Sequence, residues 1–113
     1  MDQRGDAAGQ TRETPMSVLM TLRVSGNPKG VEAFDPAILK TVADRAVEHG
    51  VLRHRFYGTD DEVLVVDEWP DEASFRAFFD ASPEIKDLMS EAGVTSEPTV
   101  EFWRELDVDD AIG

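Results

Sequence analysis

The sequence has no cysteine, only two histidines, and 11 lysines and arginines against 24 acids. Without cysteine there is no disulfide framework, no thiolate nucleophile and no Cys-ligated metal site. Two histidines provide no ligand cluster with a usable spacing, and the acidic runs lack the glycine-bearing loop of an EF-hand. We therefore expect no bound metal.

Positive charge is scarcest in the second half of the chain. The net charge is -13, and residues 60–113 hold seventeen of the acids but only three of the basic residues. Such a surface repels the phosphate backbone of nucleic acids and anionic lipids. We expect neither nucleic acid nor membrane as a partner.

Long apolar segments and phosphate-binding loops are also missing. No stretch approaches the ~20 apolar residues that a membrane span needs. The first residues, MDQRGDAAGQTRETP, lack the apolar region of a signal peptide, so the expected location is the cytoplasm. There is no glycine-rich phosphate loop and no G-x-S-x-G motif, so we expect no nucleotide, flavin, nicotinamide or other cofactor.

What is present is a single domain of ordinary composition. The 113 residues are 41% hydrophobic and 31% charged, the balance of a globular protein with one core. We predict a flexible N-terminal arm over residues 1–16, a folded domain over residues 17–106 and an acidic C-terminal tail over residues 107–113.

The hydrophobic periodicity predicts six elements in that domain. Strands are expected over residues 17–24, 51–57, 63–69 and 99–106, and helices over residues 35–49 and 71–92, the second restarting at Ser82-Pro83. The order βαββαβ is that of ferredoxin-like domains. The predicted fold class is α+β, with a four-stranded antiparallel sheet and two helical regions on one of its faces.

The strands carry apolar residues on both faces. Leu19 alternates with Met20, and Trp103 alternates with Phe102. Helices on one face would leave the other as an exposed apolar surface, which usually marks an interface. We therefore predict a homodimer formed by packing sheet on sheet. The alternative is that the tails or the hairpin cover this face.

Three segments carry a resemblance to a known family: VVDEW at the end of the third strand, the following DEASFRAFF, and SPEIKDLM. Over residues 17–106 the chain resembles the antibiotic-biosynthesis monooxygenase-like domains of the dimeric α+β barrel superfamily. The resemblance implies that fold, a homodimer, and an apolar pocket for a flat aromatic or polyketide-like molecule. Members include cofactor-independent oxygenases of phenols and quinones, haem-degrading enzymes and proteins with no known activity.

The haem-degrading branch is the poorer match. It uses an Asn on the first strand, a Trp ending the third strand and a His on the second helix. Only Trp69 corresponds, because the first strand, LMTLRV, has no Asn and Phe78 stands at the place of the helical His.

The candidate catalytic residues are His54 and Asp67. If the hairpin closes with Asp60-Asp61 at its tip, His54 lies opposite Asp67 on an apolar face, and a His paired with a carboxylate is a candidate general base. The alternative is a half-buried structural pair, and a register shifted by one residue would separate them. The same register places Arg53 and Arg55 on the opposite face, where a second subunit would lie.

The candidate substrate-binding residues are aromatic or apolar. Trp69, at a strand end, would stack on a flat ligand, and the other wall residues would be Phe56, Phe75, Phe78 and Met89. The alternative is that these side chains fill the core.

Two functions remain open from the sequence. One is a cofactor-independent monooxygenase of a phenolic molecule, in which Trp69 positions the ring and His54, oriented by Asp67, removes a proton. The other is a non-catalytic ligand-binding or stress-related dimeric barrel protein. A void beside Trp69 would favour the first, and a filled core would favour the second.

Overall fold

The computed structural model describes residues 17–113, and the expected flexible arm over residues 1–16 lies outside the described residues. The sheet and its helices follow the predicted βαββαβ order, including the predicted restart of the second helical region after Ser82-Pro83, and one short helix is additional. The elements are β2 (Val18–Ser25), α1 (Pro28–Glu32), α2 (Pro36–Glu48), β3 (Arg53–Gly58), β4 (Glu62–Trp69), α3 (Glu72–Asp80), α4 (Glu84–Glu91) and β5 (Thr99–Trp103).

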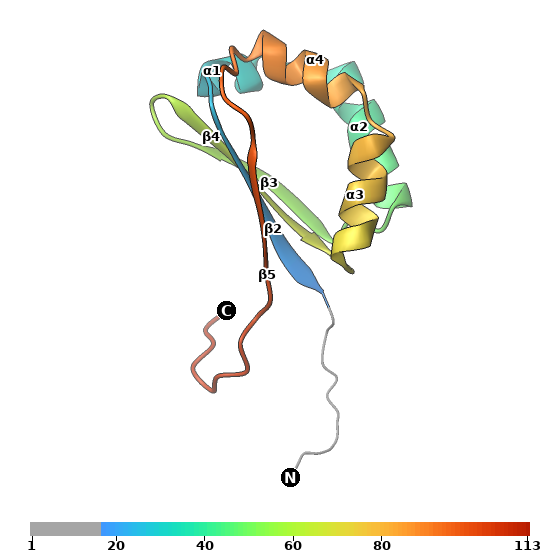
Figure 1. Cartoon of the computed structure of the whole chain (residues 1–113), viewed down its shortest axis with the longest axis vertical. Helices are drawn as coiled ribbons and strands as arrows, with labels where there is room; N and C mark the ends of the chain where they lie inside the picture. Colours follow the sequence, from blue (N-terminus) through green and yellow to red (C-terminus); the bar gives the residue numbers. More distant parts are fainter. Residues whose placement is uncertain (1–16) are drawn as a thin grey trace.

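The sheet has four antiparallel strands in the order β3-β4-β2-β5. Helices α2, α3 and α4 arch over one face, as Figure 1 shows, and no helix of residues 17–113 covers the other. This confirms the predicted α+β, ferredoxin-like fold. The face under the helices is called the inner face below, and the other the outer face.

Local signals place the helix ends close to where the sequence predicts them. The Asp35 carboxylate caps α2 by accepting a hydrogen bond from the Ala37 N–H (2.8 Å), and Pro36 occupies the first turn. Gly50 follows the last turn with a φ of 96°, a conformation that glycine adopts without strain. The segment SGNPKG, which follows the first predicted strand and lies outside the six predicted elements, starts helix α1, because Asn27 and the proline after it act as a second helix-initiation signal.

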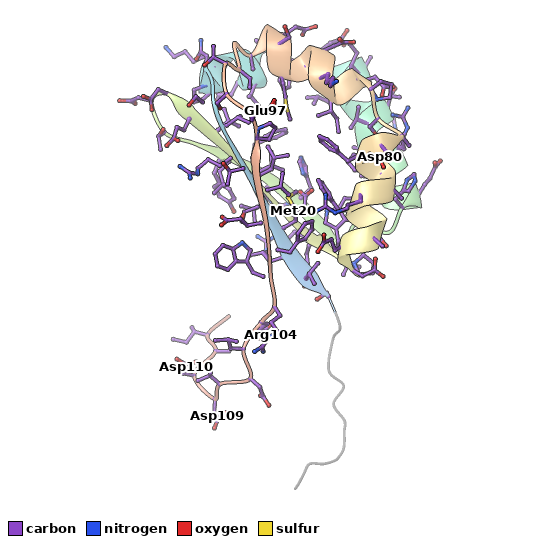
Figure 2. The ribbon with its side chains drawn as sticks, viewed as in Figure 1. Met20, Asp80, Glu97, Arg104, Asp109 and Asp110 are labelled. Atoms are coloured by element: carbon purple, nitrogen blue, oxygen red, sulfur yellow. The ribbon has the colours of Figure 1, made fainter. Side chains whose placement is uncertain are left out.

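The strands alternate between the two faces as predicted. Met20, Leu22 and Val24 of β2 and Val63 and Trp69 of β4 are buried on the inner face. Figure 2 places Met20 in the middle of the molecule. The inner face therefore holds the core.

Strand β5 is shorter than expected. It ends at Trp103 rather than at residue 106, because its neighbour β2 begins at Val18, one residue beyond the Leu19–Trp103 pair. Leu106 is exposed, and the segment with Arg104, Asp109 and Asp110 runs away from the sheet in Figure 2.

One ion pair joins α2 to the start of α4. Arg45 donates two hydrogen bonds to the Glu84 carboxylate (2.6 and 3.0 Å) and a third to the hydroxyl of buried Ser82 (3.2 Å). The hydrogen bonds from Arg45 lower the pKa of Glu84 from its ordinary 4.5 to about 2. A lowered pKa means that the folded state holds the charged carboxylate more favourably than the unfolded chain does.

We predict that Glu84→Gln lowers the melting temperature at neutral pH and flattens its dependence on acid. The contribution of Glu84 is present above its unfolded pKa of 4.5 and is lost as the pH falls from there toward about 2. Thermal unfolding of the two proteins, followed by circular dichroism, should therefore converge over this range.

The matched control is Asp44→Asn, which removes an exposed pair with Lys40 within α2. This variant should change the melting temperature little. If Glu84→Gln kept the acid dependence of the wild type, the inter-helix pair would not be the cause.

Candidate functional site

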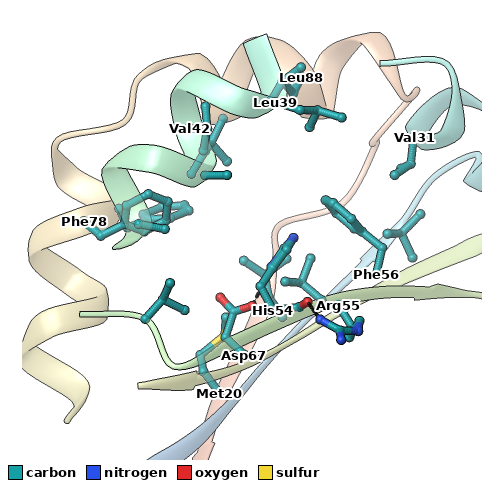
Figure 3. A pocket seen from close by; sticks show the side chains of 18 of the residues that line it. Met20, Val31, Leu39, Val42, His54, Arg55, Phe56, Asp67, Phe78 and Leu88 are labelled. Carbon is teal, nitrogen blue, oxygen red and sulfur yellow. Dashed lines mark hydrogen bonds and ion pairs between the residues drawn. The ribbon is translucent and has the colours of Figure 1, made fainter. Parts of the chain in front are cut away.

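A cavity of about 390 Å³ lies between the inner face of the sheet and the helices above it. Figure 3 shows it from close by, with Phe78 and Val42 on the helix side and Met20 on the sheet side. Its walls are apolar except where β3 and β4 contribute polar side chains. The apolar wall includes Leu22, Val24, Val63 and Val65 from the sheet, Leu39, Val42, Ala43 and Ala46 from α2, and Phe75, Phe78, Phe79, Ile85, Leu88 and Met89 from α3 and α4.

The cavity opens along strand β3 and the end of α2. Three apolar side chains that line it there, those of Val47, Leu52 and Phe56, are between 40% and 66% exposed. The lining residues of β2, by contrast, are buried. A ligand would therefore enter beside edge strand β3.

His54 and Asp67 meet at the wall of this cavity. The hairpin pairs His54 with Asp67, which confirms the predicted register. His54 Nδ1 lies 2.7 Å from Asp67 Oδ1, and the Asp67 side chain is buried while that of His54 is half-exposed. In Figure 3 a ring nitrogen of His54 points away from Asp67 into the cavity.

The second oxygen of Asp67 also has a partner. The Trp69 indole N–H donates to Asp67 Oδ2 over 3.1 Å. An ionised carboxylate only accepts hydrogen bonds, so His54 Nδ1 must donate to it and, in the neutral ring, Nε2 is left as the acceptor. Chemically, this arrangement can take a proton from a hydroxyl group held in the cavity.

Trp69 itself does not line the cavity. Its side chain is fully buried and packs against Phe75 (ring centroids 5.8 Å apart) and Phe78 (5.3 Å). The expectation that its indole stacks on a ligand is therefore wrong for this structure, and the alternative of a core residue is the one observed. The physical reason is that α3 begins directly after β4 and lays its aromatic face over the strand end.

The other four candidate residues, Phe56, Phe75, Phe78 and Met89, do line the cavity. Phe56 meets the His54 ring edge-to-face, with centroids 4.9 Å apart. Their contact with a ligand remains a prediction, as do the roles of His54 and Asp67.

Sequence reasoning missed the contribution of α2. The candidate wall residues were drawn only from the strands and from the second helical region. The usable signal was size: exposed Ala43 and buried Ala46 of α2 both line the cavity, and such small side chains leave space where large ones would fill it.

Residues 17–113 contain no group of three or more His, Asp or Glu side chains that could hold a metal ion. Within the same range, every helix is too short or too polar to cross a bilayer.

A scan against protein-family models and a search of curated proteins found no match to this chain. Solved structures are similar. A conserved protein from Methanosarcina mazei Go1 has a TM-score of 0.61 at 19% identity, covering 81% of this chain and 95% of its own. SnoaB, a cofactor-independent oxygenase from Streptomyces nogalater, has a TM-score of 0.57 at 16% identity, covering 84% and 98%. An antibiotic biosynthesis monooxygenase has a TM-score of 0.56 at 12% identity, covering 79% and 98%.

These identities show a shared fold. The protein shares its fold with SnoaB and with this antibiotic biosynthesis monooxygenase, which confirms the fold that the resemblance of VVDEW and the helix after it implied. Fold alone does not assign a reaction, so the function has to be argued from the cavity.

Because Trp69 is a core residue, we predict that Trp69→Ala lowers the free energy of unfolding by about 3–5 kcal/mol. The matched control is Phe56→Ala, which truncates an aromatic at the open mouth and should cost less than about 2 kcal/mol. Urea unfolding followed by circular dichroism measures both. Equal losses in the free energy of unfolding would contradict the core role of Trp69.

Proposed function

We propose that this protein is a homodimer in which each cavity binds a flat aromatic molecule with an acidic hydroxyl group and oxidises it with O2 without a cofactor. The observation that carries this proposal is His54 Nε2, which is left as a hydrogen-bond acceptor at the wall of a largely apolar cavity because Nδ1 is engaged by Asp67.

The walls support the class of ligand. A volume of 390 Å³ is at the lower end of small-molecule sites and suits about two or three fused rings. Phe56, Phe75 and Phe78 supply aromatic faces and edges against which such rings pack favourably. A strongly polar molecule would lose its hydration against these walls without compensation.

The dyad supports proton removal. His54 Nε2 takes the proton of the ligand hydroxyl, and the Asp67 carboxylate at Nδ1 stabilises the imidazolium that forms. The electron-rich anion then reduces O2. Where a ring CH2 becomes a carbonyl, one oxygen atom of O2 becomes the carbonyl oxygen on that carbon. The other oxygen atom leaves as water with the two hydrogens of the CH2 group.

The fold supports oxygenation as the outcome. SnoaB, which shares the fold, is described as a cofactor-independent oxygenase. This is an argument by analogy. The rival function, non-catalytic ligand binding by a dimeric barrel, predicts binding without turnover.

The test uses dithranol, a tricyclic phenol with one oxidisable ring CH2. We expect the wild-type protein to bind it and to speed its oxidation to the anthraquinone, with one O2 consumed per product. His54→Gln should lower kcat by about 100-fold or more while leaving binding intact. Oxygen uptake and product absorbance, corrected for autoxidation, measure turnover.

Ala43→Phe is the companion variant, because a phenyl ring at this exposed lining position obstructs the open part of the cavity. It should abolish binding and turnover together. Binding with no turnover in the wild type would favour the rival function, and full turnover in His54→Gln would remove His54 from the mechanism.

The outer face supports the homodimer. Leu19, Tyr57 and Trp103 lie on it and are 42–52% exposed, although they are large apolar or aromatic residues. The registers place Arg55, Val66, Thr21 and Glu101 in one row across the four strands. Arg55 lies on edge strand β3 and Glu101 on the opposite edge strand, β5.

This row is self-complementary about a two-fold axis parallel to the strands. Such an axis lays β3 of one copy over β5 of the other, so Arg55 faces Glu101 of the partner subunit. An axis across the strands would oppose like charges, which is disfavoured. Within residues 17–113 neither Arg55 nor Glu101 belongs to an ion pair.

We predict that the wild type is a dimer at micromolar concentration. Arg55→Glu and Glu101→Arg should each weaken it at least about tenfold, because close charge pairs at interfaces couple by about 1.5 kcal/mol or more. The double variant should restore it. Light scattering and sedimentation measure the mass, with Lys40→Glu on α2 as the charge-matched control that leaves it unchanged.

Two results would contradict this interface. One is a monomeric wild type, and the other is a double variant no more dimeric than the single variants.

A further inference from the structure

Asp67 is a buried carboxylate with one donor for each oxygen. His54 Nδ1 donates to Oδ1 (2.7 Å), and the Trp69 indole N–H donates to Oδ2 (3.1 Å). Buried charges are stable only when such partners are present. The carboxylate is therefore held in one orientation from two sides.

The direction of the indole N–H is itself fixed by packing. Trp69 is fully buried, lies two residues from Asp67 on the same face of β4, and is held between the rings of Phe75 and Phe78. An indole N–H can only donate a hydrogen bond, so the side chain of residue 67 has to offer it an acceptor oxygen.

We propose that Trp69 is a positioning residue that acts through Asp67. Its N–H donates to Oδ2 and leaves Oδ1 as the acceptor for His54. The neutral imidazole is thereby held in the Nδ1–H tautomer, with Nε2 free toward the cavity. The assignment of the tautomer depends only on this geometry. Its consequence for catalysis rests on the proposed function.

The alternative is that Trp69 is only a core residue and that Asp67 orients His54 by itself. The two views differ once the indole N–H is removed without loss of ring volume. If Trp69 orients Asp67, the freed carboxylate turns away from His54, and the Nε2–H tautomer of His54 becomes populated. If it does not, the tautomer is unchanged.

The first test replaces Trp69 by benzothienylalanine, in which sulfur takes the place of the indole N–H at the same ring size. Two-bond 15N–1H correlation spectra of the imidazole rings distinguish a protonated from an unprotonated nitrogen. The protein has two histidines, and the signals missing from His54→Gln belong to His54. We expect Nδ1–H in the wild type and a mixture of tautomers in the variant.

Phe79→Leu is the matched control. It loosens the packing behind Phe75, on which Phe79 stacks with centroids 5.5 Å apart, but keeps the indole N–H and the two rings against it, so His54 should stay in the Nδ1–H form. An unchanged tautomer in the folded benzothienylalanine variant would overturn the proposal, and so would Nε2–H in the wild type.

A second test changes the donor and acceptor groups of residue 67, so that the Trp69 N–H favours the Nε2–H tautomer of His54 instead of the Nδ1–H tautomer. In Asp67→Asn, the Trp69 N–H takes the carboxamide oxygen, so the NH2 group faces His54 Nδ1 and forces the proton to Nε2. In Asp67→Asn combined with Trp69→Phe, the carboxamide is free to turn its oxygen to His54, and the Nδ1–H form returns. The same tautomer in the single and the double variant would exclude an orienting role for Trp69.

The kinetic readout is separate. With dithranol, the benzothienylalanine variant should lose about tenfold or more in kcat with KM unchanged, because the base is misoriented but the walls remain. Unchanged kcat would remove the catalytic consequence. If the wild type shows no turnover, the proposed function fails while the spectra still decide the role of Trp69.

Discussion

The buried carboxylate of Asp67 constrains the rest of the structure. It lies on the apolar inner face, where each oxygen needs a donor, and the chain supplies one from the facing strand and one from its own strand. A slip of one residue in the β3–β4 hairpin would turn His54 to the outer face and bring Arg53 or Arg55 opposite Asp67. The register of the hairpin therefore decides the geometry of the candidate site.

The aromatic side chains of α3 connect the core to the cavity. Phe75 and Phe78 cover Trp69 with one side and border the cavity with another. The volume remains open because α2 faces it with Ala43 and Ala46. An apolar space of this size lowers stability relative to a filled core, so its presence beside a polar dyad favours a ligand site over a packing defect.

The two faces of the sheet carry different kinds of residues. The inner face holds the core and the dyad, while the outer face presents exposed apolar side chains with arginines on β3 and Glu101 on β5. The overall charge of -13 argues against anionic macromolecules. The row that places Arg55 and Glu101 at opposite edges of the sheet would suit a second copy of itself.

The sequence by itself determined the element order and the alternation of the strands, because these follow from local periodicity. The turn in GTDDE allowed the His54–Asp67 register without requiring it, and the strand pairing of the folded sheet selected it. Tertiary structure decided the rest. Whether Trp69 faced a ligand or the core depended on where α3 came to lie, and whether a void remained depended on α2, far away in sequence. Strand β5 stopped at Trp103 because β2 offered it no further partner. Pairing and packing between distant segments set these outcomes, and no local pattern records them.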